Sequence, residues 1–312
     1  MKFVVSTENI LKTVADVLVV GYPEGKFPQD GVLAKIDGKL NGELKRVLKK
    51  EGFKGGKTES KLFYAAGRLK VTYVLVLGLG DAKKLDLETL RTCGATAQGV
   101  AARIKAKKIV LAVFASAKGI TSEEEALALT EGFCLNQYQF TRYLKKTKNE
   151  RKEVLISCAQ KDQKKAGQAI RHAQILSEGV ALARDLVNTP AVDMTPMDLA
   201  RAAKKLKGVR VSVRQLGWIK QKKMGAFLSV AAGSTKNAPC FIEMTYQPRG
   251  RIKKRIAIVG KGVTFDSGGY SLKLGKGMEN MKSDMAGAAA VIGLMTILPM
   301  LKPAVAVSCY IA

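Results

Sequence analysis

Four charged residues follow a short apolar run near the C-terminal end of the chain. We expect the run, Ile256–Val259, to form a buried strand. The residues that follow it are Lys261, Asp266, Lys273 and Asp284. In open α/β sheets, ligands bind beyond the carboxyl ends of strands, and charges gathered there need a compensating group. A pair of divalent metal ions would compensate these four charges.

The residue types suit metal-assisted hydrolysis. The carboxylates of Asp266 and Asp284 suit hard divalent ions, and zinc accepts them too. Asp284 lies near the start of an expected helix, where a carboxylate is favoured. Lys261 can join them only as the neutral amine, a form that a nearby dication favours. Lys273 need not bind metal, because its protonated amine could stabilise the oxyanion that forms when water attacks a carbonyl.

Two other interpretations fit the same residues. Gly268-Gly269, Gly275 and Gly277, together with lysines and a helix start, could form a phosphate-binding loop. The order G-x-x-x-x-G-K-[ST] is absent from this stretch, however. The segment could also be a surface loop with Lys–Asp salt bridges. The spacing alone leaves all three interpretations open.

Alternating apolar runs and amphipathic stretches predict an α/β fold with a mainly parallel or mixed sheet in each of two domains. In the first half we expect strands at 1–6, 15–21, 61–64, 71–78, 108–114 and 153–158. The helices expected there span 30–52, 87–107 and 122–145.

A long helix over 164–187, stopped by Asn188-Thr189-Pro190, is the candidate bridge between the domains. Thr195 as N-cap and Pro196 at the first helical position predict a helix that ends at Lys207. Further helices are expected at 219–226 and 286–298, and strands at 209–215, 239–246, 255–259 and 304–311. The predicted organisation is therefore an N-terminal α/β domain (1–160), a linking helix (161–190) and a second domain (191–312), which contains the four charged residues and is the candidate catalytic domain. The last strand is apolar enough to need neighbours on both sides.

The composition is strongly basic, with 53 Lys and Arg against 26 Asp and Glu and a formal charge of +27. Such a charge makes a nucleic-acid partner one interpretation, although the basic runs lack interleaved aromatic residues. A lysine-coated, solvated surface is the favoured one. The clustered cations are Lys145-Lys146, Lys204-Lys205, Lys220–Lys223 and Arg251–Arg255.

The remaining composition points to a cytoplasmic protein. The five cysteines form no CxxC pair and fit reduced core thiols. The one histidine, His172, lies on a helical stretch, where a surface role is the ordinary one. The N-terminus lacks the pattern of a secretory signal, and no uninterrupted apolar run reaches the length that spans a bilayer, so we expect no membrane segment.

Two long motifs in the same region resemble a known family. VGKGVTFDSGGYSLK, followed by MENMKSDMAGAAAV, closely resembles the signature of the leucyl aminopeptidases, the cytosol aminopeptidases with two metal ions. ARDLVNTPAVDMTPMDLA and MGAFLSVAAGS resemble upstream landmarks of that family, in the same order. The resemblance covers about Lys164 to Ala312, whereas the earlier part matches only in its α/β pattern.

The resemblance implies roles for five residues. Lys261, Asp266 and Asp284 fall on metal-ligand positions, with Asp266 bridging two ions, and Lys273 falls on the catalytic lysine. Met281 falls on a residue that lines the pocket for the substrate's first side chain, although without the resemblance it would be taken as a core methionine. The implied reaction releases the N-terminal residue, leucine-like by preference, from a peptide. The implied cofactors are two Mn²⁺ or Zn²⁺ ions, with Mg²⁺ also used, and bicarbonate as base, and the implied assembly is a homo-hexamer.

One expected motif is missing from the sequence. The family places two further carboxylate ligands and a bicarbonate-binding arginine in a downstream N-T-D-A-E-G-R motif, which these 312 residues do not contain. From this we expect an incomplete catalytic domain, weak metal binding and negligible aminopeptidase turnover by this chain. The alternatives are a basic nucleic-acid-binding protein or an inactive assembly subunit with the same fold.

Overall fold

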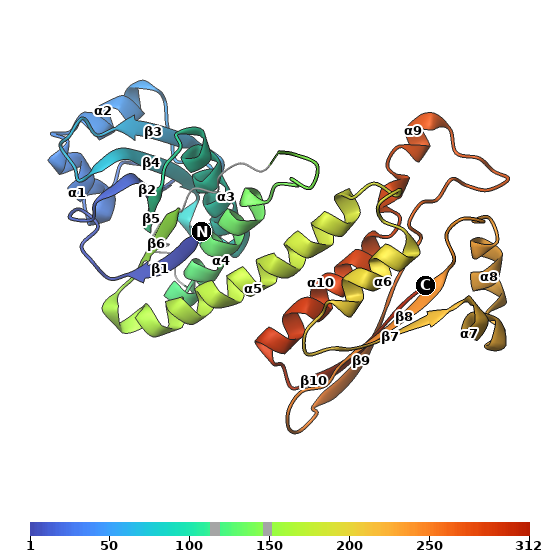
Figure 1. Ribbon diagram of the computed structural model, residues 1–312. Coiled ribbons are helices and arrows are strands. Elements are labelled where there is room, and N and C mark those ends of the chain that lie inside the picture. The colour runs from blue at the N-terminus through green and yellow to red at the C-terminus, as the bar shows by residue number, and fades with distance from the viewer. Residues whose placement is uncertain (113–118, 146–151) are drawn as a thin grey trace. The chain divides into compact units, whose positions relative to one another are not determined.

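The computed structural model describes residues 1–112, 119–145 and 152–312. The chain divides into two compact units, Met1–Gln174 and Ile175–Ala312, and the division falls inside helix α5 (Gln163–Asn188). Figure 1 shows a sheet flanked by helices in each unit. The predicted α/β architecture with two sheets is therefore confirmed, while the assignment of 161–190 as a linking helix stays a prediction.

The first unit contains a six-stranded sheet in the order β1-β6-β5-β2-β4-β3. All neighbours are parallel except β3 and β4. Its central strands are almost continuously apolar, as expected when helices cover both faces. The strands are β1 (Lys2–Ser6), β2 (Ala15–Pro23), β3 (Ser60–Tyr64), β4 (Val71–Gly80), β5 (Lys108–Ala112) and β6 (Glu153–Ser157).

The helices of the first unit differ in three places from the sequence prediction, and one of them is the helix predicted over 87–107, which ends at Arg103. The helix predicted over 30–52 is two helices, because Asn41 and Gly42 take positive φ and break it. The helix predicted over 122–145 ends at Gln137. Phe114, at the end of a predicted strand, and Lys146, in a basic pair, lie outside the described residues. The helices are α1 (Gly31–Lys39), α2 (Glu43–Lys50), α3 (Leu87–Arg103), α4 (Ser122–Gln137) and two 3-10 helices, η1 (Ala82–Lys84) and η2 (Gln160–Asp162).

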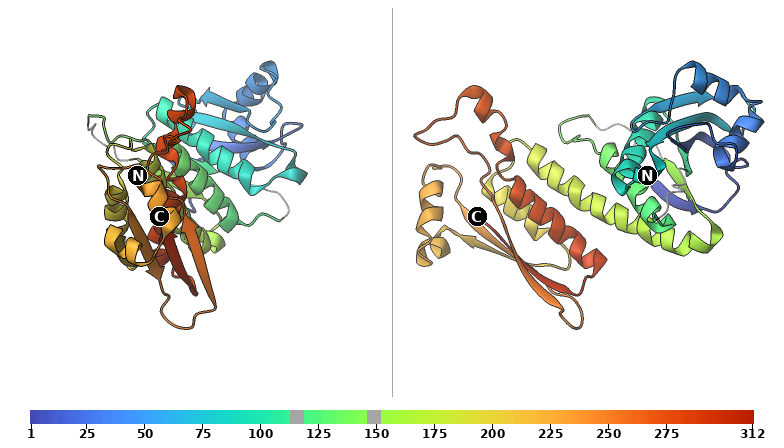
Figure 2. Two further views of the ribbon diagram at one scale, coloured as in Figure 1. Left: turned by 90° about the vertical axis from the view of Figure 1, so that its right-hand side faces the viewer. Right: turned by 180° about the vertical axis from the view of Figure 1, so that it is seen from behind.

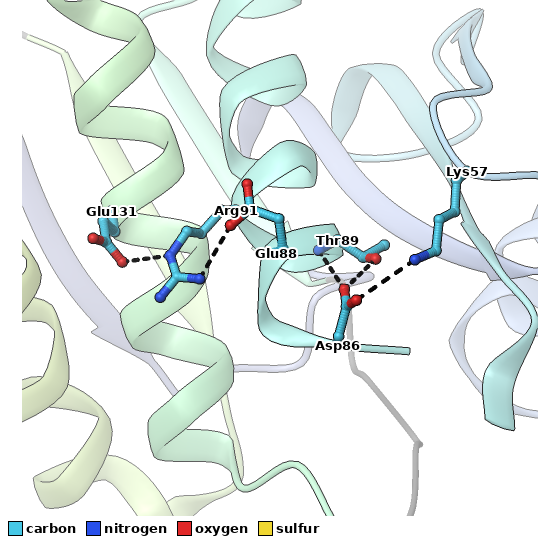
Figure 3. Close-up of polar contacts among 6 residues, drawn as sticks. All are labelled: Lys57, Asp86, Glu88, Thr89, Arg91 and Glu131. Atoms are coloured by element: carbon cyan, nitrogen blue, oxygen red, sulfur yellow. Dashed lines mark hydrogen bonds and ion pairs between the residues drawn. The ribbon is translucent and has the colours of Figure 1, made fainter. Parts of the chain in front are cut away.

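Helices α3 and α4 pack closely because two glycines remove the side chains between them. A Cβ on Gly94 would overlap the carbonyl oxygen of Leu129, and one on Gly132 would overlap that of Arg91. Arg91 also joins the helices through an ion pair, with its Nε 2.7 Å from Oε2 of Glu131 (Figure 3). The close approach thus depends on glycine at both positions.

The start of α3 is fixed by a capping side chain. Oδ1 of Asp86 accepts hydrogen bonds from the backbone N–H and the hydroxyl of Thr89, at 2.8 and 2.6 Å. These two bonds, the hydroxyl first, hold the pKa of Asp86 below its usual value. Lys57 Nζ lies 3.7 Å from Oδ2 of the same carboxylate, as Figure 3 shows.

The second unit contains a four-stranded mixed sheet in the order β7-β8-β10-β9. Only β9 and β10 are parallel. β10, predicted to need a neighbour on each side, lies between β8 and β9 as expected. The strands are β7 (Arg210–Gln215), β8 (Cys240–Tyr246), β9 (Lys254–Gly260) and β10 (Val305–Ile311).

The predicted buried strand is exposed. β9 forms the edge of the described sheet, and Ile256 and Val259 are 37% and 77% exposed. The sequence prediction was wrong because an apolar run reports the residue types of a strand and not the neighbours that cover it.

Helices cover one face of the second sheet more fully than the other. α6 (Pro196–Lys204) and α10 (Ala286–Leu301) bury its apolar face, as Figures 1 and 2 show. Thr195 caps α6 as predicted, in a reciprocal capping box with Asp198. The helix predicted over 219–226 is two short helices, α7 (Leu216–Gln221) and α8 (Gly225–Ala231). They place Trp218 and Phe227 against Phe241, on the opposite face.

One apolar stretch of the second unit passes a length and composition test for a membrane span, at Gly275–Leu301. In the structure this stretch is three helices, α9 (Gly275–Met278), the 3-10 helix η3 (Met281–Ser283) and α10. α10 packs on the sheet with Ile292 and Met295 completely buried, as is Met285 just before it. The stretch therefore includes a core helix of this unit.

Candidate metal centre

The end of β9 and the start of α10 bring Lys261 beside Asp284. A Cβ on Gly260 would lie 2.8 Å from the carbonyl oxygen of Gly287, so only glycine permits this approach. The N–H of Ala288 donates to the carbonyl oxygen of Lys261 at 2.9 Å and fixes the contact. Lys261 Nζ then lies 3.3 Å from Oδ2 of Asp284. The structure therefore brings these two predicted site residues together, and their role as metal ligands stays a prediction.

Asp284 contains an oxygen that lacks a hydrogen bond. Its Oδ2 is buried and accepts no hydrogen bond from the described residues. The ion pair to Lys261 meets the distance for opposite charges but not the alignment of a hydrogen bond. A buried carboxylate oxygen without a hydrogen bond is costly, and a bound metal ion would remove that cost.

Asp266 and Lys273 form a second pair in the loop between β9 and α9. Lys273 Nζ donates to Oδ2 of Asp266 at 2.7 Å, and the N–H of Gly268 donates to Oδ1 at 2.9 Å. These two bonds, that of Lys273 first, hold the pKa of Asp266 below its usual value, and the charge of Lys261 adds to the effect. The carboxylate is thus kept ionised, as a metal ligand must be.

Glycines shape this loop. Gly268 and Gly269 take positive φ, and a Cβ on Gly268 would overlap the carbonyl oxygen of Ser271. The N–H of Lys273 donates to the carbonyl oxygen of Ser267 at 3.0 Å, which returns the lysine toward Asp266. These glycines serve the turn, whereas Gly275 and Gly277 have open space around them.

Met281 lies beside the same lysine. Lys273 Nζ is 3.2 Å from its sulfur, so Met281 adjoins the Asp266–Lys273 pair instead of lying in the core. Met281 begins η3, the single turn that leads to Asp284. The structure therefore brings Lys273, Met281 and Asp266 together at one pair, and Lys261 and Asp284 at the other.

Sequence reasoning missed Lys282, which anchors the segment between Met281 and Asp284. Its Nζ donates to the carbonyl oxygen of Asn188, the last residue of α5, at 3.1 Å. A cation at a helix C-terminus is favoured by the exposed carbonyls there. The position of Lys282 between two predicted site residues was the available signal.

The donor set fits a divalent metal ion in part. Two carboxylates and one lysine amine are the candidate ligands. The described residues contain no cluster of three or more His, Cys, Asp and Glu residues that could bind a metal ion.

The histidine and the cysteines lie outside this donor set. His172 is exposed on α5, as predicted for a surface residue. The cysteines are free thiols, and burial raises the pKa of Cys93 to about 12 and of Cys240 to about 11.

An apolar groove of about 720 Å³ adjoins Lys261 within the second unit. Its lining includes Val192, Phe227, Val259 and Phe265. Val192 and Val259 are also strongly exposed. The candidate ligands thus lie beside an apolar surface.

Comparison with known proteins identifies the family. Residues 181–312 match the model of the cytosol aminopeptidase family, catalytic domain, and residues 19–148 match its N-terminal domain. The chain belongs to the cytosol aminopeptidase family. Lys261, Asp266, Lys273, Met281 and Asp284 all lie within the part that matches the catalytic domain.

Relatives of known name agree with this membership. A probable cytosol aminopeptidase of Alkaliphilus oremlandii is 33% identical over 98% of this chain and 62% of its own length. That of Aquifex aeolicus is 37% identical over 88% of this chain and 55% of its own length. The chain spans about three fifths of the length of the curated relatives it matches.

Solved structures show the same fold. A mutant of tomato leucine aminopeptidase superposes with a TM-score of 0.86 at 29% identity, over all of this chain and 62% of that one. The bottromycin maturation enzyme BotP in complex with Mn gives a TM-score of 0.78 at 29% identity, over 96% of this chain and 59% of its own. The family is thus supported by sequence and by structure.

Proposed function

We propose that this chain supplies the first part of the catalytic centre of a metal-dependent aminopeptidase. Lys261, Asp266 and Asp284 are the proposed ligands, and Lys273 is the proposed catalytic lysine. The observation that carries the proposal is the buried Oδ2 of Asp284, which has no hydrogen bond and lies 3.3 Å from the amine of Lys261. Mn²⁺ is the first candidate metal, since a structure of a related enzyme contains it.

Metal ions bound at these ligands would supply an activated water and polarise the scissile carbonyl. Lys261 would hold a metal ion through its neutral amine, so the amine would give up its proton when the ion binds. Asp266 is kept ionised by Lys273 and by the N–H of Gly268, and is ready to bind without losing a proton. The ammonium group of Lys273, which donates to Asp266 at 2.7 Å, would stabilise the oxyanion that develops on the substrate.

We propose peptides with an apolar, leucine-like N-terminal residue as substrates. Met281 offers a flexible apolar surface beside Lys273, and the apolar groove lies next to Lys261. Bicarbonate as base, a homo-hexameric assembly and a cytoplasmic location belong to the same proposal. Membership in the family motivates the first two, and the name of the relatives, cytosol aminopeptidase, supports the location.

A segment exchange tests the function. Residues 256–289 would replace the matching segment of a full-length relative, such as that of Aquifex aeolicus, and hydrolysis of leucine p-nitroanilide would be measured with Mn²⁺. We expect turnover within about tenfold of the parent, and a loss of at least about 100-fold when the segment carries Asp284→Asn or Lys273→Met.

Gly277→Ala in the same segment is the matched control, because a Cβ there meets open space. It should leave turnover unchanged. A folded exchange protein without turnover would show that these residues do not form a working centre, and full activity of the Asp284→Asn form would exclude that residue as a ligand.

A further inference from the structure

Three basic segments meet at the end of the second sheet that lies away from α9 (Figures 1 and 2). They are Lys204–Arg210, Tyr246–Arg255 and Pro299–Val305, which we call the basic end. The N–H of Lys253 donates to the carbonyl oxygen of Ala304 at 2.9 Å. A Cβ on Gly208 would lie 2.9 Å from Cβ of Pro299. Strand pairing of Arg210 with Thr245 joins the first segment to β8, so all three share one end of the sheet.

The basic end has cations without anions. It contains ten Lys and Arg residues and no Asp or Glu. The ten are all exposed, and none forms an ion pair with a described carboxylate. The nearest carboxylates in the sequence, Asp198 and Glu243, pair with Arg201 and Arg214 instead. The ten are Lys204, Lys205, Lys207, Arg210, Arg249, Arg251, Lys253, Lys254, Arg255 and Lys302.

This surface is separate from the candidate metal centre. β9 begins in the basic end at Lys254 and ends beside the centre at Gly260. A strand of that length spans about 20 Å, which is more than two Debye lengths at physiological salt. Charges at the basic end therefore have little effect on the metal ligands.

The side-chain types indicate what would bind. Four of the ten cations are arginines, whose planar guanidinium groups match phosphate oxygens in pairs. Single strands are bound by exposed aromatic rings, and Tyr246, the one aromatic residue in the three segments, is buried with its hydroxyl on the carbonyl oxygen of Pro303. Contacts to the phosphates of a duplex need no such rings.

We propose that the basic end binds the phosphate backbone of duplex nucleic acid without reading its sequence. Arg249 and Arg251 lie in the connection between β8 and β9, residues 247–253. In the proposed complex they make the outermost contacts to the phosphates. Binding there leaves the candidate metal centre free. The proposal does not depend on the peptidase function.

Fluorescence anisotropy with a labelled 30-base-pair DNA duplex tests the proposal. With about four phosphate contacts, the dissociation constant should rise roughly 100-fold between 50 and 200 mM salt. The charge-reversed variant Arg249→Glu/Arg251→Glu should bind at least about tenfold more weakly at 50 mM salt, because it loses two contacts and adds two repulsions.

A control of equal charge separates a defined surface from the overall charge. Lys164→Glu/Lys165→Glu changes the same number of charges at the exposed start of α5, where carboxylates are tolerated. It should weaken binding less than about threefold. Equal losses in the two variants, or no binding by the natural sequence at 50 mM salt, would overturn the proposal. If polyglutamate binds as tightly as the duplex, the ligand of the basic end is an acidic polypeptide, and the proposal of duplex nucleic acid is wrong.

Discussion

Gly260→Ala should open the contact that places Lys261 beside Asp284. Its new methyl group would lie 2.8 Å from the carbonyl oxygen of Gly287 and 2.9 Å from Cα of Ala288, both backbone atoms that cannot rotate away. Ordinary van der Waals contact begins at 3.4 Å, so β9 and α10 must separate by about 0.6 Å.

Two losses should follow from that separation. The 2.9 Å hydrogen bond from Ala288 to Lys261 weakens, and overpacking of this kind costs about 1–3 kcal/mol of unfolding free energy. Misplacing ligands by a large fraction of an ångström should also weaken Mn²⁺ binding by about tenfold or more. Electron paramagnetic resonance of free Mn²⁺ measures the affinity for the metal. Urea unfolding followed by circular dichroism measures the free energy of unfolding.

Gly277→Ala is the comparison variant, because it adds the same methyl group to α9 where nothing lies within 4 Å. It should bind Mn²⁺ like the natural sequence and unfold at the same or a higher urea concentration. If Gly260→Ala instead matches Gly277→Ala in both measurements, the close approach of β9 and α10 does not position the ligands.

Three further predictions concern stability and packing. Gly94→Ala should lower the unfolding free energy by about 1–3 kcal/mol, since its Cβ would overlap the carbonyl of Leu129, whereas Gly99→Ala, with one flexible neighbour, should not. Asp86→Ala should cost about 1 kcal/mol at neutral pH. Because the folded pKa of Asp86 is lowered, its contribution is present above its usual pKa and fades as pH falls through the folded value, so urea titrations of the two proteins should converge in acid. Phe241→Leu should shift Trp218 emission to longer wavelength, because the ring stacked on it at 5.8 Å is removed; an unchanged spectrum would contradict that packing.

The elements of the fold could be predicted where the signal is local. Val71–Gly80 is almost continuously apolar and forms a central strand, and Thr195-Pro196 caps a helix as its residue types indicate. The break at Asn41 and Gly42 was missed, because Leu40 and Leu44 are both buried and continue the helical spacing across it. Periodicity reports which residues face the core and does not report the backbone angles between them.

The candidate site could be predicted by residue type but not by geometry. The four charged residues and Met281 were found from the motif, yet spacing does not show that Lys261 pairs with Asp284 and Lys273 with Asp266. That pairing follows from contacts between segments, above all the approach of Gly260 to Gly287. The exposure of β9 was likewise beyond the sequence, since it depends on which strands become neighbours.

Paramagnetic broadening by Mn²⁺ in the amide NMR spectrum tests the central claim most directly, because it detects weak binding and locates it. The account predicts that the amides around Lys261, Asp266 and Asp284 broaden first as Mn²⁺ is added to the protein. It also predicts that Asp284→Asn largely abolishes this pattern. Broadening that begins elsewhere, or that is the same in Asp284→Asn, would contradict a metal centre at these residues.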